Sequence, residues 1–221
     1  MTGCFQTLEF LGEDIPPYAF FSHTWEDDEV LFGDISASNL TASRRKRGWH
    51  KLVQRYRQAC KDGCQWCWID TCCIDKTPSA ETFEAINTIF RWYQKAMVCY
   101  AYLAEVRTLQ DSETVLDNLG AQNSEVGSDQ SCVVYQTSKW FSCGWTLQEL
   151  IAPMVVRFFG YHWCYLADKS SHLLKLSRAT SIDELTLNHT TPLSKIFEDK
   201  AHCLLGENAF SRLQEEIIRF T

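Results

Sequence analysis

Short apolar runs alternate with longer amphipathic segments along most of this chain. Four of these runs have the length and composition of buried strands, and each is followed by polar or turn-forming residues. They cover residues 17–23, 65–75, 98–104 and 155–159. We predict one strand in each run.

Apolar residues spaced three and four positions apart predict helices between and after these strands. The predicted helices span about residues 49–61, 77–97, 138–152 and 210–220. Helices that alternate with continuous apolar strands are typical of a parallel sheet that is covered on both faces. We therefore expect an α/β protein with a three-layer open parallel sheet and a short helical C-terminal tail.

One long segment, residues 107–137, has no hydrophobic period and is rich in acidic residues, Gly, Asn and Ser. A loop of this length is usually functional or disordered. We divide the chain into a lead-in of residues 1–15, a main domain of residues 16–166 that carries the long acidic loop, and a shortened C-terminal helical region of residues 167–221.

Composition narrows the class of protein. The 221 residues carry 21 Lys and Arg against 28 Asp and Glu, a net charge of −7, which argues against general nucleic-acid binding. No apolar run approaches the about 20 residues of a membrane span, and residues 1–10 do not resemble a secretory signal. Eleven cysteines, an odd number, fit reduced thiols. We expect a cytoplasmic protein that binds neither nucleic acid nor membrane.

Candidate chemistry gathers where the predicted strands end. In open α/β sheets, ligands bind outside the carboxyl ends of the strands. The side chains expected there include Ser22, His23 and Trp25 after the first strand, Asp70 and Cys72 after the second, and Trp145 and Glu149 on the third helix. Aromatic planes beside carboxylates suit a ligand with a flat ring and a sugar. The alternative is that solvated loop carboxylates lie beside core tryptophans.

The cysteines have several interpretations. Cys64 and Cys67 form a CxxC pair, but a structural zinc site usually needs a second pair, and none is present. A nucleophilic Cys72 or Cys73 assisted by His23 is a further alternative. Thiols buried in the core are the preferred interpretation. We expect neither a metal nor a resident cofactor.

The segment between Asp34 and Asp62 has no acidic residue, and it contains a basic run, Arg44–Arg47. Such a run can bind acidic lipid or nucleic acid, or act in nuclear import. The preferred interpretation is a solvated helix face that offers a surface to a partner or to the acidic loop.

Four ordered blocks together resemble the fungal heterokaryon-incompatibility (HET) domain. The blocks are YAFFSHTW (18–25), WIDTCCIDK (68–76), FRWY (90–93) with CYAYL (99–103), and GWTLQELIAP (144–153). This resemblance implies a role in fungal non-self recognition, in which HET domains trigger growth arrest and cell death when incompatible cells fuse. HET domains usually have a longer region before the terminal helix, including a YGEG segment that this chain lacks.

The HET domain is in turn similar to the Toll/interleukin receptor (TIR) domain, which implies a flavodoxin/TIR-like sheet. Trp145 and Glu149 match the TIR motif WxxxE, whose glutamate is catalytic in TIR domains that hydrolyse NAD. The resemblance thus implies Glu149 as the catalytic residue, with Ser22, His23, Trp25, Asp70, Cys72 and Trp145 around the substrate. A structural Glu149 that caps a helix or pairs with an arginine is the alternative.

We therefore expect an effector of vegetative incompatibility that promotes cell death, with NAD as its candidate substrate. Two alternatives stay open: a non-enzymatic module that signals by self-association, and an inactive truncated paralogue. The expected protein partners are further copies of the chain and a separate incompatibility or sensor protein.

Overall fold

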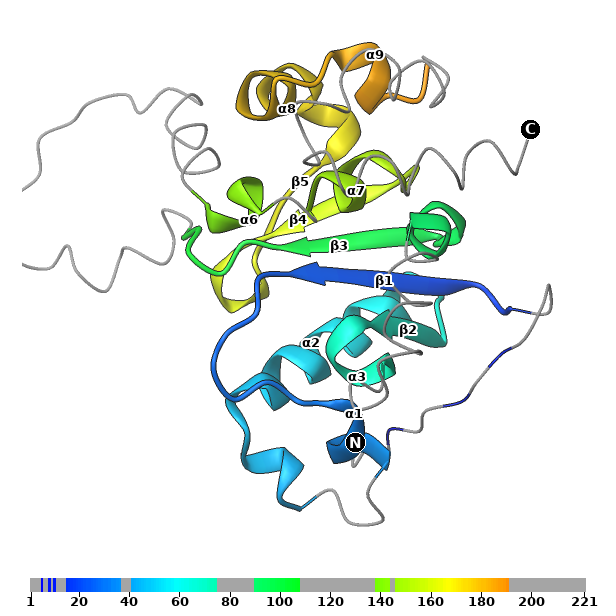
Figure 1. Ribbon diagram of the computed structural model, residues 1–221, viewed down its shortest axis with the longest axis vertical. Coiled ribbons are helices and arrows are strands. Elements are labelled where there is room, and N and C mark those ends of the chain that lie inside the picture. The colour runs from blue at the N-terminus through cyan, green and yellow to red at the C-terminus, as the bar shows by residue number, and fades with distance from the viewer. Residues whose placement is uncertain are drawn as a thin grey trace, which may run out of the picture.

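The computed structural model describes residues 15–36, 41–74, 90–107, 138–143 and 146–190, together with residues 5, 8 and 10. Within them, five strands form one sheet in the order β2-β1-β3-β4-β5 (Figure 1). The strands are β1 (Tyr18–His23), β2 (Trp66–Ile69), β3 (Val98–Tyr102), β4 (Val156–Phe159) and β5 (Tyr165–Asp168). The first four are parallel, and β5 pairs antiparallel with β4.

Helices cover both faces of this sheet. One face packs against α2 (Arg47–Lys61), with α1 (Phe32–Ser36) and α3 (Asp70–Cys73) nearby (Figure 1). The other face packs against a helix at residues 90–95 and against four short helices. These are α6 (Lys139–Ser142), α7 (Thr146–Ile151), α8 (Leu173–Thr180) and α9 (Glu184–Leu187). The order of the strands is that of flavodoxin-like doubly wound sheets, with an antiparallel edge strand added.

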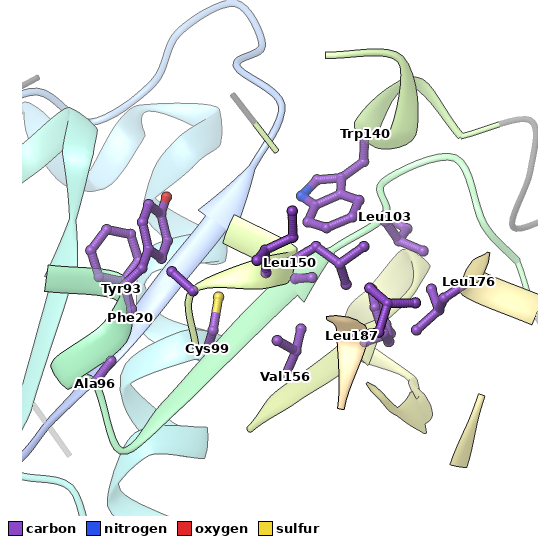
Figure 2. Packing of buried hydrophobic residues seen from close by; sticks show 14 of the residues in the cluster. Phe20, Tyr93, Ala96, Cys99, Leu103, Trp140, Leu150, Val156, Leu176 and Leu187 are labelled. Carbon is purple, nitrogen blue, oxygen red and sulfur yellow. The ribbon is translucent and has the colours of Figure 1, made fainter. Parts of the chain in front are cut away.

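The side chains of strand β1, which lies between β2 and β3, contribute to both hydrophobic cores of the molecule. Every residue of β1 is buried, which is typical of a parallel strand covered on both faces. Because side chains alternate along a strand, Ala19 and Phe21 enter the α2 core while Phe20 enters the other. Figure 2 shows this second core, in which Phe20 lies beside Tyr93 and Leu150 lies near Trp140.

The α/β class, the open sheet and the four predicted strands are confirmed. The second strand is shorter than predicted, because it ends at Ile69 and the next four residues form α3. The third predicted helix is two helices, since Cys143 has extended backbone with φ −87° and ψ 124°. Residues 108–137 and 191–221, which include most of the acidic loop and the terminal helix, lie outside the described residues.

No strand or α-helix was predicted within residues 160–190, where the structure has β5, α8 and α9. Their apolar residues Ala167, Leu176 and Leu187 are almost fully buried, and the last two belong to the core that contains Phe20. The expected boundary at residue 166 therefore falls inside β5, and residues 167–190 pack with the main domain. Within the described ranges, no helix is long and apolar enough to cross a membrane.

Candidate functional site

The carboxylate of Glu149 lies at the carboxyl end of β1, and two hydroxyl groups bind it. Ser22, the penultimate residue of β1, donates a hydrogen bond to Oε2. Tyr93, from the helix that precedes β3, donates to Oε1 at 2.5 Å. The indole Nε1 of Trp140 donates to Ser22 Oγ at 2.7 Å, so the hydroxyl of Ser22 is oriented toward the carboxylate. Four elements thus converge on one carboxyl group.

Burial makes this carboxyl group unusual. Removal from water raises the pKa of Glu149 to about 7, and the charge of Asp70 raises it further, although the hydrogen bonds from Ser22 and Tyr93 oppose the rise. Burial and the neighbouring Glu149 raise the pKa of Tyr93 well above its ordinary value, so its hydroxyl remains a donor. Glu149 therefore changes charge near neutral pH, as expected for a carboxylate at a functional site.

The helix that carries Glu149 is fixed at its end by a buried lysine. Lys169 Nζ donates to the carbonyl oxygens of Leu150 at 3.2 Å and Pro153 at 2.6 Å. A cation at the C-terminus of a helix satisfies carbonyl groups that have no partner within the helix and interacts well with its dipole. Lys169 follows β5, so the edge strand of the sheet helps to fix the direction of α7.

Trp25 and Asp70 form a second group at the same ends of the strands. Trp25 Nε1 donates to Asp70 Oδ2 at 2.7 Å, although these residues follow different strands. The Trp25 side chain is held in this direction while 55% of the residue stays exposed to solvent. An exposed indole that a carboxylate holds in place offers a flat surface for a ring, and Asp70 is close enough to Glu149 to affect its pKa.

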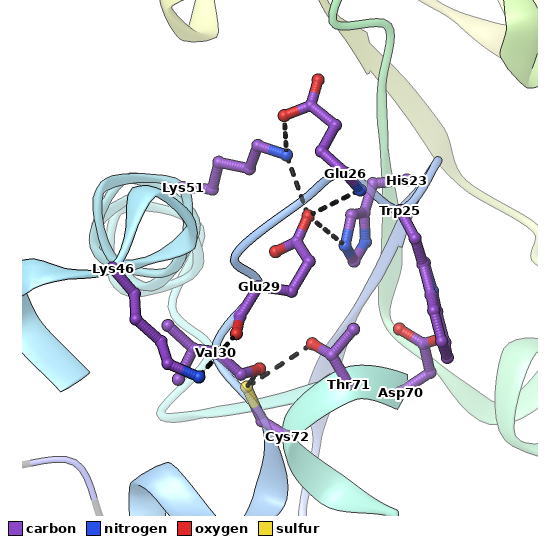
Figure 3. A network of polar contacts seen from close by, with 10 residues as sticks. All are labelled: His23, Trp25, Glu26, Glu29, Val30, Lys46, Lys51, Asp70, Thr71 and Cys72. Carbon is purple, nitrogen blue, oxygen red and sulfur yellow. Dashed lines mark hydrogen bonds and ion pairs between the residues drawn. The ribbon is translucent and has the colours of Figure 1, made fainter.

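His23 lies on the opposite face of the sheet from Ser22, because adjacent residues of a strand point in opposite directions. Its Nε2 lies 3.5 Å from Glu29 Oε1, and Lys51 Nζ donates to the same oxygen at 2.9 Å (Figure 3). Lys51 also pairs with Glu26. Burial, assisted by the charge of Arg55, lowers the pKa of His23 to about 3, so this imidazole is neutral at physiological pH.

Glu29 stays ionised in this network. Although burial raises its pKa, the hydrogen bonds and charges of His23 and Lys51 outweigh that effect and lower the pKa to about 2. The result is a buried ion pair between Glu29 and Lys51 beside a neutral histidine. These residues brace the loop after β1 against α2 (Figure 3). They lie on the other side of β1 from Ser22 and its partner Glu149.

Cys72 also lies on the α2 face. Its buried thiol donates to the carbonyl oxygen of Val30 at 3.1 Å, and burial raises its pKa to about 11. Burial likewise raises the pKa of Cys73 to about 12. A thiol with so high a pKa is a poor nucleophile at neutral pH. No cluster of three metal-binding side chains occurs in the part of the chain that the structure describes.

Of the seven predicted site residues, the structure brings Ser22 and Glu149 into direct contact and places the pair of Trp25 and Asp70 nearby. His23 and Cys72 lie on the other face, as described above, and Trp145 lies outside the described residues. Tyr93 and Trp140 contact this group but were not predicted to do so. Tyr93 lies within the predicted helix 77–97, and its hydroxyl is a polar group that needs a hydrogen-bond partner when it is buried.

Comparison with known proteins gives a family match. The model of the family "Heterokaryon incompatibility protein (HET)" matches residues 18–149, from the first residue of β1 to Glu149. The chain is 41% identical over 168 residues to the vegetative incompatibility protein HET-E-1 of Podospora anserina. That alignment covers 75% of this chain and 11% of the relative, so the chain spans about a tenth of that protein's length. No solved structure matches.

Proposed function

Because this chain belongs to the heterokaryon incompatibility (HET) family, we propose that it is a cytoplasmic effector of fungal vegetative incompatibility that promotes cell death by cleaving NAD. The name of the relative in Podospora anserina supports the role in incompatibility. The resemblance of HET domains to NAD-hydrolysing TIR domains supports the chemistry. The trigger is a separate incompatibility or sensor protein.

The observation that carries the enzymatic proposal is the convergence of Ser22, Tyr93 and Trp140 on Glu149. These side chains meet at the end of β1. The next strand along the chain, β2, lies on one side of β1, and β3 lies on the other. Such a reversal in strand order is where flavodoxin-like sheets bind nucleotides. The match to the family model contains all four residues.

Cleavage breaks the bond between C1′ of the ribose and the nitrogen of nicotinamide. The bonding electron pair leaves with nicotinamide, which needs no proton, and the ribose becomes an oxocarbenium-like cation. The carboxylate of Glu149 stabilises this positive charge, as carboxylates do in glycoside hydrolysis. Water then adds to C1′, and the proton that it loses passes to Glu149. The reaction therefore requires Glu149 in its ionised form.

Neighbouring residues have supporting roles in this mechanism. Ser22 and Tyr93 hold the carboxylate in one orientation through its two oxygens. Trp25 offers its exposed face to an aromatic ring of the substrate, while Asp70 keeps the indole in place. Two carboxylates, Asp70 and Glu149, favour a positively charged ring such as nicotinamide in NAD.

Incubation of the purified full chain with NAD tests the proposal, with released nicotinamide measured by chromatography. We expect turnover by the wild type and a loss of at least about 100-fold in Glu149→Gln, because removal of one charge-stabilising group commonly has that effect. Glu184→Gln, a change at an exposed carboxylate on α9, is the matched control and should keep wild-type activity. Equal turnover by all three proteins would exclude the mechanism.

A self-associating signalling module is the second candidate function. The observation in its favour is that Arg44, Arg45 and Arg47 are exposed together at the start of α2. Expression in a fungal host separates the two functions when viability and cellular NAD are scored together. Toxicity that survives Glu149→Gln but falls after charge reversal of these arginines would favour self-association over NAD cleavage.

A further inference from the structure

On the face of β1 opposite to Glu149, three side chains surround the ring of Phe21. The guanidinium carbon of Arg55, from α2, lies 3.0 Å from the centroid of this ring. The indole of Trp163, from the short helix Tyr161–Trp163, stacks on the same ring at 5.8 Å. Tyr102, at the end of β3, stacks on Trp163 at 5.6 Å. Arg55 and Trp163 therefore contact the same ring, that of Phe21.

Two of these side chains have buried donors with no acceptor. Within the described part of the chain, Nε and Nη2 of Arg55 and Nε1 of Trp163 are buried and have no hydrogen-bond partner. Arg55 is only 2% exposed. The carboxylate whose charge favours the ionised form of Arg55 most is that of Glu29, but Glu29 pairs with Lys51 and His23. A buried guanidinium without an acceptor is costly, and proteins keep such groups where an anion binds them.

The backbone also holds Trp163 in an uncommon conformation. His162 and Trp163 have φ values of 55° and 63°, which are rare for residues with bulky side chains. This geometry places the indole against Phe159 at 4.6 Å and over Phe21. Strained backbone of this kind clusters at active sites, ligand-binding segments and switch regions. Trp163 and Tyr102 are only partly buried, so the group of rings reaches the surface of the molecule.

We propose that Arg55 and Trp163 form an anion subsite that binds the diphosphate of the dinucleotide substrate. The inference rests on the proposed function, because it places one substrate across the end of β1. Phe21 and Ser22 are neighbours in that strand, so the diphosphate binds on the α2 face while the reactive ribose lies beside Glu149 on the other. Guanidinium and indole N–H groups donate to phosphate oxygens, and the fork of Arg55 suits a diphosphate.

Binding of ADP-ribose to the purified full chain, measured by calorimetry, tests this subsite without any need for turnover. Arg55→Met should bind ADP-ribose at least about tenfold more weakly, because a charge-assisted hydrogen bond is lost. Trp163→Phe, which keeps a ring but lacks the N–H group, should bind it a few-fold more weakly. Arg45→Met, a change at an exposed arginine, should bind like the wild type. Nicotinamide riboside, which has no diphosphate, should bind Arg55→Met and the wild type equally.

Arg55→Met should also stay folded, with a melting temperature equal to or above that of the wild type, since it removes an unpaired buried charge. If this variant fails to fold, Trp163→Phe alone decides the question. Wild-type affinity for ADP-ribose in the folded variants, or no binding of ADP-ribose by the wild type, would overturn the subsite.

The two proposals fail in different ways. If the wild type releases no nicotinamide from NAD but binds ADP-ribose through Arg55, NAD cleavage is excluded and the diphosphate subsite stands. If turnover depends on Glu149 while the affinity for ADP-ribose does not depend on Arg55, the subsite is excluded and NAD cleavage stands.

Discussion

The replacement Glu149→Gln should change how the stability of this protein depends on pH. The ordinary pKa of the glutamate side chain, 4.5, applies to the unfolded chain, and burial raises it to about 7 in the folded protein. Between these values the folded state holds a proton that the unfolded state has lost. By linkage, the free energy of unfolding therefore falls as the pH rises through this range, and the loss is complete above the folded pKa.

The size of the effect follows from the two pKa values. One pKa unit corresponds to about 1.36 kcal/mol, so the difference between 4.5 and about 7 costs the folded wild type about 3 kcal/mol at alkaline pH. A typical domain is stable by only about 5–15 kcal/mol. Glutamine stays neutral at every pH, so Glu149→Gln does not lose this part of the free energy of unfolding. The variant should match the wild type in acid and exceed its stability by about 3 kcal/mol at alkaline pH.

Urea unfolding followed by tryptophan fluorescence measures this difference at several values between about pH 4.5 and about pH 8.5. Other titrating groups, such as His23, contribute equally to both proteins and cancel in the comparison. The control Glu184→Gln changes an exposed carboxylate and should stay within about 0.5 kcal/mol of the wild type throughout.

A stability difference between Glu149→Gln and the wild type that is independent of pH would refute the reasoning, because Glu149 would then have the same pKa in both states. The expected result has a consequence for activity. The ionised form that NAD cleavage requires is the form that destabilises the fold, so turnover should increase over the range in which stability decreases.

Two further substitutions probe the frame around the site. Gly48→Ala should destabilise the protein by about 1–3 kcal/mol in urea unfolding, because a Cβ there would lie 2.7 Å from Glu29 Oε2 and 2.9 Å from the backbone nitrogen of Val30. Lys169→Met should lower the free energy of unfolding by about 1–3 kcal/mol, since the buried carbonyl group of Leu150 loses the lysine donor and that of Pro153 keeps only His189. A melting temperature of Lys169→Met equal to that of the wild type would show that this lysine does not stabilise the end of α7.

Much of the fold could be predicted because the parallel strands are buried on both faces and are therefore continuous apolar runs. The edge strand β5 lacks this signal. Tyr165 is exposed and Asp168 pairs with Arg157, so the four residues of β5 contain too few apolar positions to form a pattern. Composition was also misleading at the end of the second predicted strand. Cys72 and Cys73 have the composition of a strand, but they form part of α3.

Only some of the residues of the candidate site could be predicted from the sequence. The rule that ligands bind at the ends of strands singled out Ser22 and Asp70, but it did not separate the faces of the sheet. The alternation of side chains along a strand would have placed His23 opposite to Ser22. The contact between Tyr93 and Glu149 joins positions 56 residues apart in the sequence, and it depends on packing that no local pattern contains.

The position of two consecutive residues in β1 limits how this domain can change. Ser22 donates a hydrogen bond to the carboxylate of Glu149 on one side of the sheet, and His23 contacts Glu29 on the other. An insertion of a single residue before them would move Ser22 to the place of His23, beside Glu29, and would put Phe21 beside Glu149. A deletion would instead place the imidazole of His23 beside Glu149. Natural variation in the length of the chain ahead of this point must therefore be absorbed before Tyr18, where the first strand begins.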